Sequence, residues 1–488
     1  MNFTKFILLI FLSSLFASCE DFLDPEPTSA ILVDEFYSSP AELELGVNAI
    51  IAAIQGDNAS DFDQDNLRGM QIEYFVTEML SDNTESRSPD PDSANAFREF
   101  ENYTVNTNNA ISANYYASMY RVIYLSNLVI DSIESGLVTD SSSEAEARFY
   151  RAFAYFNLIR LYGENSEDLG VPLIDHVLTE GEENLSYIRA TEDEIYDLII
   201  SDFSLAASGL DDSSYNRASK SAAHTFLAKV YLTLDEPDYT SAILHLDQVY
   251  GNYSLLDNYA DIFGQSNEGN DEIIYSIGYI ETAEDGQNFS AEFLRQGDTT
   301  TGANYLSTDL HSALVESGGA NRQLFGEDNF NTNETKYANL KHLSTSTGLD
   351  VDESINGGAD WIVLRYADVI LMYAEAYMGA DDTLDVSIYP WGTDYNLIRT
   401  RAGLEEVTDI TKDELLDERR YELYAENHRL FDLVRFGVAD TVLAEYSRLN
   451  TRDFSTYEVN LPIPLREINL SPLDSDGNKL LIQNISWR

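Results

Sequence analysis

The sequence has little cysteine and little positive charge. It contains one Cys, six His and three Trp, and its 29 Lys and Arg residues face 85 Asp and Glu residues. One thiol cannot form a disulfide within the chain, so a disulfide framework is excluded. The formal net charge of −56 repels phosphate groups, which makes nucleic acid an unfavourable partner and a neutral ligand a better fit than a polyanion.

Long apolar runs are absent after the start of the chain. Lys5 precedes a nearly unbroken apolar run at 6–16, which is too short to span a bilayer of roughly 30 Å, and no run of about 18 apolar residues follows. A positive charge, an apolar run and then the small residues Ala17 and Ser18 are typical of a secretory signal. We therefore expect residues 1–18 to be a signal peptide and the mature chain to have no transmembrane helix.

The single cysteine, Cys19, follows this segment directly. Residues 16–19, Phe-Ala-Ser-Cys, are typical of a bacterial lipobox, so we expect cleavage before Cys19 and lipidation of this residue, with more than one acyl chain for stable anchoring. An ordinary signal peptide beside an incidental cysteine is the alternative. Residues 19–28 are acidic and contain two prolines, which predicts an extended tether and membrane contact through the lipid alone.

The body of the chain has the spacing of apolar residues that is typical of amphipathic helices. This spacing predicts helices at 40–54, 115–133, 144–162, 191–207, 219–234, 239–250, 361–377, 393–402 and 411–436. Thr191 with Glu194, and Thr411 with Glu414, predict capping boxes. Two of the helices, joined by a short breaker at 235–238, resemble a degenerate tetratricopeptide unit, although a plain helical hairpin fits that pattern equally well.

Residues from about 251 to 355 differ from the helical parts. They are rich in Gly, Asn, Asp, Ser and Thr, and they contain one strand-like run at 272–280. Long irregular segments in a domain commonly carry binding residues or move. The tail at 457–488 contains an extended Leu-Pro-Ile-Pro run, and we expect it to lie along the surface of the body.

Several sequence blocks occur in an order that one protein family shares. They are Cys-Glu-Asp-Phe-Leu-Asp-Pro at 19–25, Glu-Ala-Arg-Phe-Tyr-Arg-Ala-Phe-Ala-Tyr-Phe at 146–156, Leu-Ala-Lys-Val-Tyr-Leu at 227–232, Leu-Arg-Tyr-Ala-Asp-Val at 364–369, Arg-Thr-Arg-Ala-Gly-Leu at 399–404, Glu-Arg-Arg-Tyr-Glu-Leu at 418–423, His-Arg-Leu-Phe-Asp-Leu-Val-Arg at 428–435 and Leu-Pro-Ile-Pro at 461–464. With these blocks the chain resembles, over nearly its whole length, the SusD/RagB family of glycan-binding lipoproteins of Bacteroidota.

The resemblance implies a mostly α-helical fold in which four tetratricopeptide-like helix pairs support a more irregular, loop-rich half with a few short strands. It implies that residues 29–488 form a single SusD-like domain with a glycan-binding insert at about 251–355. It also implies lipid anchoring at Cys19 on the outer face of the outer membrane, and delivery of captured glycan to a SusC-like TonB-dependent transporter. The acidic pair Glu20-Asp21 is similar to the surface-export signal of these lipoproteins.

No sequence signature of an enzyme is present. The sequence lacks a phosphate-binding loop, a His-Glu-x-x-His motif and a Gly-x-Ser-x-Gly motif, and its histidines lack the spacing of metal ligands. We therefore expect no catalytic residue, no cofactor and no metal. Glu418, Glu422 and Glu426 share one helix face close to Arg429 and Arg435, and we interpret this block as a structural ion-pair network.

Sugar rings present an apolar face and a rim of hydroxyls, so their binding sites combine aromatic rings with polar side chains on loops. Two loop regions, on which the family's pockets also draw, carry our candidates. These are Asp82, Asn83, Arg87, Phe97 and Phe100 in the first region, and Tyr279, Phe289, Arg295, Asn304 and Tyr305 in the second. Trp391 is a third option, because a Trp between Pro390 and Gly392 is expected on a loop.

The sequence favours a cell-surface protein that captures an oligosaccharide or polysaccharide without cleaving it. The acidic surface favours a neutral glycan, for example a β-glucan such as laminarin, over sulfated or uronic-acid polymers. One alternative is a helical-repeat scaffold that binds a protein or peptide in the cell envelope. Another is a surface glycosidase, since the abundant Asp and Glu residues could supply a catalytic carboxylate pair.

Overall fold

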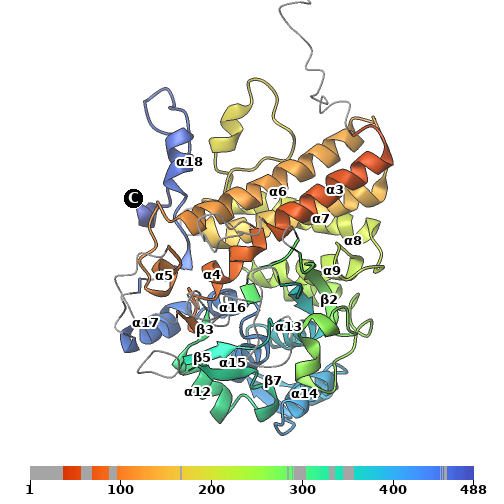
Figure 1. Ribbon diagram of the computed structural model, residues 1–488, viewed down its shortest axis with the longest axis vertical. Coiled ribbons are helices and arrows are strands. Elements are labelled where there is room, and N and C mark those ends of the chain that lie inside the picture. The colour runs from red at the N-terminus through yellow and green to blue at the C-terminus, as the bar shows by residue number, and fades with distance from the viewer. Residues whose placement is uncertain are drawn as a thin grey trace, which may run out of the picture.

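The computed structural model describes residues 37–56, 69–86, 96–164, 168–282, 285–287, 289–290, 304–328, 336–343, 357–450, 452, 454–455 and 459–488. In these ranges helices predominate and strands are few and short, as the resemblance implied (Figure 1). The α-helices are α3 (Pro40–Gln55), α4 (Glu73–Thr77), α5 (Ala96–Glu101), α6 (Ala110–Glu134), α7 (Ser141–Tyr162), α8 (Glu192–Gly209), α9 (Lys220–Thr233), α10 (Tyr239–Leu246), α12 (Thr308–Glu316), α13 (Tyr366–Met378), α14 (Gly392–Arg401), α15 (Lys412–Leu423), α16 (Arg429–Arg435), α17 (Ala439–Leu449) and α18 (Leu465–Leu470). The strands are β1 (Thr84–Glu85), β2 (Ile273–Ile277), β3 (Tyr305–Leu306), β4 (Phe325–Asp328), β5 (Lys336–Asn339), β6 (Trp361–Arg365), β7 (Thr383–Asp385) and β8 (Asp409–Thr411). Within the same ranges, none of the helices is long and apolar enough to span a bilayer.

Capping side chains set the beginnings of several helices. Both predicted capping boxes are present, at α8 and α15, where the threonine Oγ1 accepts a hydrogen bond from the N–H of the glutamate three residues on, at 3.2 Å in each case. Helix α6 begins at Ala110, earlier than predicted, because Asn109 Oδ1 accepts from the Ser112 N–H at 2.9 Å. The predicted helix positions in this half of the chain are otherwise confirmed to within a few residues, apart from an earlier end of α10.

The amino-terminal helices form a stack of successive neighbours. Helix α6 contacts α3 and α7, α8 contacts α7 and α9, and α10 contacts α9 and α13. Figure 1 shows α3, α6 and α7 side by side across the top of the molecule, with α13, α14 and α15 in its lower half. Gly46 on α3 allows close packing here, because a Cβ at this position would lie 2.5 Å from the Tyr37 ring and 2.8 Å from the Val129 side chain.

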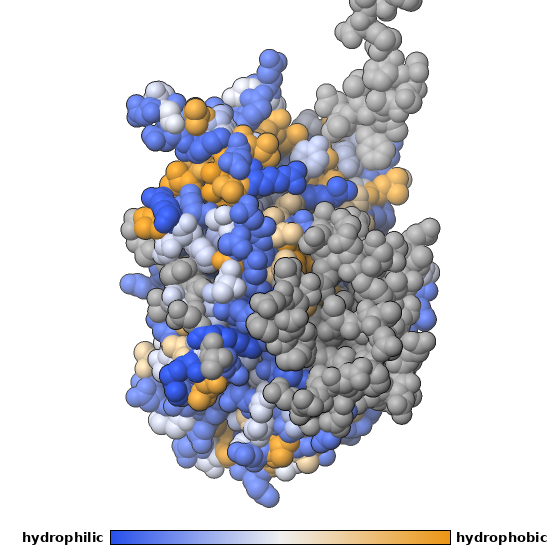
Figure 2. Space-filling view, turned by 60° about the vertical axis from the view of Figure 1, so that its left-hand side comes forward, coloured by the Kyte–Doolittle hydropathy of each residue, from blue (hydrophilic) through white to orange (hydrophobic). Residues whose placement is uncertain are grey.

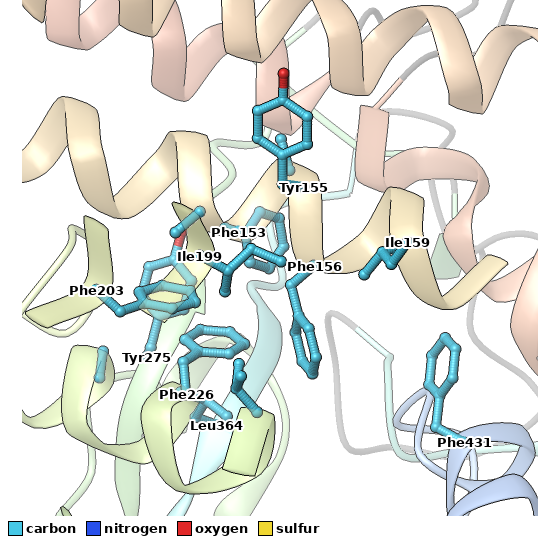
Figure 3. Close-up of a cluster of buried hydrophobic side chains, with 14 of the residues drawn as sticks. Phe153, Tyr155, Phe156, Ile159, Ile199, Phe203, Phe226, Tyr275, Leu364 and Phe431 are labelled. Carbon is cyan, nitrogen blue, oxygen red and sulfur yellow. The ribbon is translucent and has the colours of Figure 1, made fainter. Parts of the chain in front are cut away.

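Aromatic side chains join the helical stack to a short sheet (Figure 3). Phe203 of α8 and Phe226 of α9 stack with their ring centroids 5.1 Å apart, and Phe226 also contacts Phe153 of α7 edge-on at 5.6 Å. Tyr275 of β2 and Leu364 of β6 lie beside this cluster and are buried. Removing one such buried ring typically costs about 3–5 kcal/mol, so this cluster holds the stack and the β2–β6 sheet together.

The strands form three small antiparallel sheets, ordered β1-β3-β5-β4, β2-β6 and β7-β8. Residues 361–365 were predicted to begin a helix, and this prediction is wrong, because they form β6 with Trp361 opposite Ile277 of β2. The aromatic and β-branched residues of the run Trp-Ile-Val-Leu suit a strand, and pairing with β2 decides between the two structures. The helical periodicity begins only at Tyr366.

The predicted helix 411–436 is two helices. Helix α15 ends at Leu423 and α16 begins at Arg429, and between them Ala425 and Asn427 have φ angles of 57° and 63°. A left-handed backbone cannot continue a right-handed helix, so the chain turns here. The insert at about 251–355 also contains more regular structure than expected, since α12 and β3 to β5 lie within it.

Buried ion pairs connect these elements. Arg365, at the end of β6, pairs with Glu272, Glu422 and Glu426 at nitrogen–oxygen distances of 2.9, 2.7 and 2.7 Å. Arg401 of α14 pairs with Glu272 and Glu422, each at 2.6 Å. Guanidinium groups satisfy buried carboxylates well because they donate in a planar fork. The network ties the β2–β6 sheet to α14 and α15, which is the structural role that the sequence predicted for this block.

The described part of the tail lies along the body, as expected. The Leu461 N–H donates to the Leu161 carbonyl at 2.6 Å, and Asn484 Nδ2 donates to the Leu461 carbonyl at 3.0 Å. The Trp487 indole N–H donates to the Asn460 carbonyl at 3.2 Å. The tail is therefore fixed to the end of α7, while α18 and the turn after it project from the molecule (Figure 1).

Candidate functional site

The four-stranded sheet brings the two predicted loop regions together. Strand β1 of the first region pairs with β3 of the second, with Thr84 opposite Leu306 and Glu85 opposite Tyr305. Strand β3 in turn pairs with β5, and the Lys336 ammonium of β5 lies 2.7 Å from the Glu85 carboxylate. Segments more than 200 positions apart in the chain therefore meet in one small sheet.

The residues before β1 fix this sheet to the helical body. The Asp82 carboxylate accepts from Arg429 at 2.7 and 2.8 Å, and Arg420 lies 3.0 Å away. These guanidinium groups lower the pKa of the buried Asp82 far below its ordinary value despite the opposing effect of burial. Asn83 Oδ1 accepts from Arg420 Nε at 2.9 Å, and its carbonyl accepts from the Ser307 N–H at 2.8 Å. The side chains of Asp82 and Asn83 therefore bind arginines of the protein itself. These contacts do not support the predicted role of Asp82 and Asn83 in binding sugar.

The predicted aromatic candidates of the two regions lie in the core. Phe97, Phe100, Tyr279, Phe289 and Tyr305 are each at most 5% exposed. The Phe97 ring stacks on Phe75 at 5.5 Å, and Tyr279 meets Phe289 edge-on at 5.6 Å. The sequence cannot distinguish a ring that anchors the base of a loop from one that projects from its tip, because both are aromatic residues in loop-like surroundings. In this structure these five rings are anchors.

Trp391 lies away from the sheet. It is 3% exposed and stacks between tyrosines at ring distances of 6.0 Å to Tyr373 and 5.2 Å to Tyr389. Its place at the start of α14 makes it part of the helical core rather than of the loop face. Arg87, Arg295 and Cys19 lie outside the described residues.

A row of polar side chains crosses the sheet. Continuing the register of β1 with β3 places Ser86 opposite Asn304, and continuing that of β3 with β5 places Asn304 opposite Asn339. All three are at most 3% exposed, yet Ser86 Oγ, both polar atoms of the Asn304 amide, and Asn339 Nδ2 have no hydrogen-bond partner among the described residues. We call Ser86, Asn304 and Asn339 the polar row.

The polar row has the hydrogen-bonding capacity that hydroxylated ligands require. An amide offers two donors and an acceptor, and a hydroxyl offers a donor and acceptors, which match the rim of a sugar ring. A buried polar atom without a partner costs about 1–3 kcal/mol, so each such atom in a native protein requires water, a ligand or another explanation. Of the predicted candidates, Asn304 alone belongs to this row.

Half-buried aromatic rings lie on the same sheet. The His311 ring of α12 stacks on Tyr337 of β5 at 3.3 Å between centroids, and Phe325 of β4 meets both edge-on at 4.8 and 6.0 Å. Tyr337 and Asn339 lie two positions apart on β5, so their side chains share one face of the sheet. This ring cluster was not predicted, because the region is rich in loop-forming residues and the alternating run at 336–339 is only four residues long.

The described residues offer no metal chemistry. No group of three or more His, Cys, Asp or Glu side chains within the described ranges could hold an ion. Two carboxylates close to the polar row, Glu85 and Glu101, are each paired with a cation, Lys336 and Arg452. Both of these carboxylates are therefore engaged in ion pairs.

A second concave surface lies at the other end of the molecule, on α6. Two projections rise there, the loop at 174–188 and the α18 region, as Figure 1 shows. Between them is a groove of about 500 Å³, lined by Tyr116, Tyr120 and Tyr124 of α6 and by Tyr187 and Leu481. We call it the upper groove.

Exposed apolar side chains surround the upper groove. On the two projections, five aliphatic side chains are 37–60% exposed: Leu185, Ile188, Leu470, Leu473 and Ile482. Figure 2 shows hydrophobic residues gathered below projections at the top of the molecule. Contiguous exposed apolar surface of this kind is typical of protein–protein or membrane contacts.

Comparison with known proteins agrees with this architecture. A family model described as "SusD family" matches residues 245–487, and one described as "Starch-binding associating with outer membrane" matches residues 21–232. The two matched ranges leave only 1–20, 233–244 and 488 unmatched. The SusD-like protein P25 of Formosa agariphila is 26% identical, over 98% of this chain and 99% of that protein. The starch-binding protein SusD of Bacteroides thetaiotaomicron is 23% identical, over 74% of this chain and 76% of that protein.

Solved structures show the same fold. A laminarin-binding SusD-like protein superposes with a TM-score of 0.72 at 20% identity, covering 92% of this chain and 99% of that one. Surface glycan-binding protein A from Bacteroides thetaiotaomicron, in complex with laminarihexaose, gives a TM-score of 0.71 at 19% identity, over 91% and 99% of the two chains. Two matching family models that divide the chain between them, full-length relatives and the shared fold lead to one conclusion. The chain belongs to the SusD family.

Proposed function

We propose that this protein is a non-catalytic glycan-binding lipoprotein that holds a neutral oligosaccharide or polysaccharide at the sheet β1-β3-β5-β4. The observation that carries the proposal is the polar row on the sheet built from both predicted loop regions. Its side chains are buried, and four of their hydrogen-bonding atoms have no partner among the described residues. The ring cluster of His311, Tyr337 and Phe325 supplies aromatic surface beside it. Binding of laminarihexaose by a protein of the same fold supports the same ligand class.

The charges around the sheet favour an uncharged ligand. Beside the polar row, Lys336 is paired with Glu85, and Arg420 is paired with Asp82 and Asp309. Neither cation is available to a uronate or sulfate group without breaking an existing pair. The net charge of −56 adds long-range repulsion of a polyanion. We therefore propose a neutral glycan, with a β-glucan such as laminarin as the first choice.

The substitution Asn304→Leu tests the binding site. Because both polar atoms of this amide are unpaired within the described structure, replacing it by an apolar side chain of similar size should leave thermal stability unchanged or slightly higher. Loss of two or more hydrogen bonds to sugar should weaken laminarin binding about tenfold or more by calorimetry. Asn252→Leu, at an exposed position away from the sheet, is the matched control and should bind normally.

Three results would contradict parts of this proposal. Unchanged laminarin affinity of a folded Asn304→Leu protein would remove the polar row from the site. Binding of alginate without binding of laminarin would overturn the choice of a neutral glycan. Release of reducing ends from laminarin by the purified protein would overturn the non-catalytic assignment in favour of a glycosidase.

The proposal also covers how the protein is anchored in the membrane and where it delivers the glycan. We propose that Cys19 is the lipidated residue and that the protein passes its glycan to a SusC-like TonB-dependent transporter on the outer face of the outer membrane. The match of residues 21–232 to a family described as associating with the outer membrane supports this location. Cys19→Ser should abolish incorporation of labelled palmitate and release the protein from cells. Retention of the label would contradict lipidation at Cys19.

The upper groove supports a second role for this protein, the binding of a partner protein. Exposed apolar side chains on the two projections beside the groove form the kind of surface that protein–protein contacts use. We propose that the upper groove contacts the membrane-embedded transporter.

Charge substitution at the α18 projection tests this contact. Leu470→Asp with Leu473→Asp should reduce co-purification of a TonB-dependent barrel from detergent-solubilised membranes, while laminarin binding is unchanged. Leu244→Asp is the matched control, since Leu244 is 60% exposed on α10, away from the groove. Equal co-purification of the barrel with both variants would remove the groove from the interface.

A further inference from the structure

A pocket of about 480 Å³ lies on the helical body and shares no residue with the polar row or the upper groove. It opens between α7, the turn after α9, α16 and the tail. Its lining combines apolar side chains, among them Leu232, Leu430, Val434 and Val459, with the polar surface of Arg160, Asp235 and other side chains. This volume falls within the range of about 300–1,000 Å³ that is usual for small-molecule sites.

Arg160 is held rigidly and makes no ion-pair contact within the described ranges, although the buried Glu73 carboxyl is close enough to attract its charge. Its guanidinium lies between two rings, 4.0 Å from the Phe156 centroid and 3.7 Å from the Phe431 centroid. Nε donates to the Phe156 carbonyl at 3.1 Å and Nη2 donates to Asn157 Oδ1 at 2.6 Å. Figure 3 shows the two rings, Phe156 on α7 and Phe431 rising from α16 toward α7. No carboxylate among the described residues forms an ion pair with Arg160, and Nη1 makes no hydrogen bond to a described residue.

Arg435, the second arginine of the pocket, differs from Arg160 because it is paired with carboxylates. Arg435 lines the same pocket, but its guanidinium is bonded to Glu375 at 2.5 and 2.9 Å and to Asp432 at 2.7 Å. In a chain with 85 acidic residues, a guanidinium fixed between two rings with no described carboxylate in ion-pair contact is unusual. Burial lowers the pKa of Arg160 to about 10, so the group remains a cation at neutral pH.

A small inner cavity adjoins the pocket at Arg160. It has a volume of about 40 Å³, and Arg160, Phe431 and Arg435 line both spaces. Glu73 and Asn157 face it, and each carries a buried polar atom, Glu73 Oε2 and Asn157 Nδ2, with no hydrogen-bond partner among the described residues. The cationic side of the pocket therefore continues into a polar interior with unused hydrogen-bonding capacity, which is independent evidence that polar ligand atoms or water belong there.

We propose that the pocket at Arg160 binds a small organic monocarboxylate with an apolar body. The ring-held guanidinium would receive the carboxylate through its free edge, since charge-assisted bonds from arginine to carboxylate are among the strongest available. The aliphatic and aromatic walls would cover the apolar body. This site is separate from the proposed glycan site and does not rest on it.

The side chains that line the Arg160 pocket and the net charge of the protein disfavour sugar acids and polyanions as ligands. A sugar acid would bring hydroxyls against Leu and Val side chains that cannot pair with them, which is unfavourable. A polyanion would meet the repulsion of the whole molecule. Asp235, an exposed residue of the turn after α9, lines the pocket and would repel the carboxylate moderately.

The first test compares a carboxylate with its neutral counterpart on the unaltered protein. 3-Phenylpropanoate should bind in ligand-observed NMR and calorimetry at low ionic strength, whereas 3-phenylpropanamide, of the same shape, should bind about tenfold more weakly or not at all. Glucuronate and sulfate should bind more weakly than 3-phenylpropanoate. Equal binding of the amide, equal binding of sulfate, or no binding of the carboxylate would overturn the proposal.

Variants then locate the site. Arg160→Gln should weaken 3-phenylpropanoate binding about tenfold, and unchanged affinity would overturn the proposal. Asp235→Asn, in an exposed turn where folding is not at risk, should tighten binding roughly threefold by removing a like charge. The neighbouring Glu236→Gln, which does not line the pocket, is the matched control and should have no effect. Identical affinities of the Asp235→Asn and Glu236→Gln proteins would place the ligand elsewhere. Laminarin affinity should be the same in all three variants.

Discussion

Glu78, directly after α4, is a carboxyl group whose ionisation is set by burial. It is 1% exposed, and burial raises the pKa of its carboxyl from 4.5 to about 7, while its Oε1 accepts from the Asn427 N–H at 2.7 Å. Because this pKa is raised on folding, the folded protein holds a proton that the unfolded chain releases between pH 4.5 and 7. The corresponding contribution to stability is present below pH 4.5 and is lost as the pH rises to about 7.

The variant Glu78→Gln should reveal this dependence. Gln keeps the oxygen acceptor and carries no charge, so we expect the variant to be more stable than the wild type by on the order of 2 kcal/mol at pH 8 and nearly equal to it at pH 5. Urea unfolding at both pH values measures the difference. Glu445→Gln, at an exposed pair on α17, is the control and should show no comparable pH dependence. The same stability difference at pH 5 and pH 8 would contradict the assignment.

Some residue roles were predictable from spacing alone. Glu422 and Glu426 are four positions apart in a block rich in arginine, and this block predicts structural ion pairs of the kind that Arg365 makes with both. The predicted common helix face is not formed, because α15 ends at Leu423 and Glu426 lies in the turn after it. The roles of the aromatic residues were not predictable in the same way. Phe97 and Tyr305 have loop-like neighbours in the sequence, and only the three-dimensional packing makes them core residues. The polar row also depends on strand register, which spacing along one segment does not reveal.

At the level of elements, the turn between α15 and α16 decides the path of the chain. Ala425 adopts a left-handed conformation with φ of 57°, which costs an L-residue other than glycine roughly 1–2 kcal/mol. Its carbonyl accepts a hydrogen bond from His342 Nε2 at 2.5 Å, so the turn also orients a buried contact to the segment after β5. Helical spacing runs through this region in the sequence, which is why the break was not predicted.

A matched pair of substitutions measures the strain in this turn. Ala425→Gly should leave the free energy of unfolding within about 1 kcal/mol of the wild type, because relief of strain offsets the lost methyl burial and the greater freedom of the unfolded chain. Ala374→Gly, at a buried position inside α13 where no strain is relieved, should cost at least about 1 kcal/mol more than Ala425→Gly. Denaturant unfolding of both variants provides the comparison. Equal losses of stability would show that the left-handed turn carries no measurable strain.

On the scale of the whole molecule, negative charge far exceeds positive charge. Many buried acids, such as Glu422, are paired with arginines, so most of the excess negative charge lies on the surface and acts against compactness. The fold class and the order of the helices were predictable from periodicity and from the family blocks. The sheet was not, because its strands are two to four residues long and lie far apart in the sequence.

Salt should stabilise this protein. Raising NaCl from 10 to 300 mM shortens the screening distance from about 30 Å to below about 10 Å, which weakens repulsion between surface carboxylates more than it weakens buried ion pairs. We expect the melting temperature to rise by several degrees, and KCl to have the same effect as NaCl. Scanning calorimetry measures the shift. A fall in melting temperature with salt would show that exposed ion pairs, rather than surface repulsion, dominate the electrostatic contribution.

The pairing of β1 with β3 and β5 also affects how the protein is made. A chain that emerges amino end first presents Thr84 and Glu85 long before Tyr305 and Tyr337 have left the ribosome. The helical stack from α3 to α10 consists of neighbours in sequence and can assemble during that interval. The sheet proposed to bind sugar is therefore completed only after the helical stack has been made, and a chain interrupted after α10 would contain the stack without that sheet.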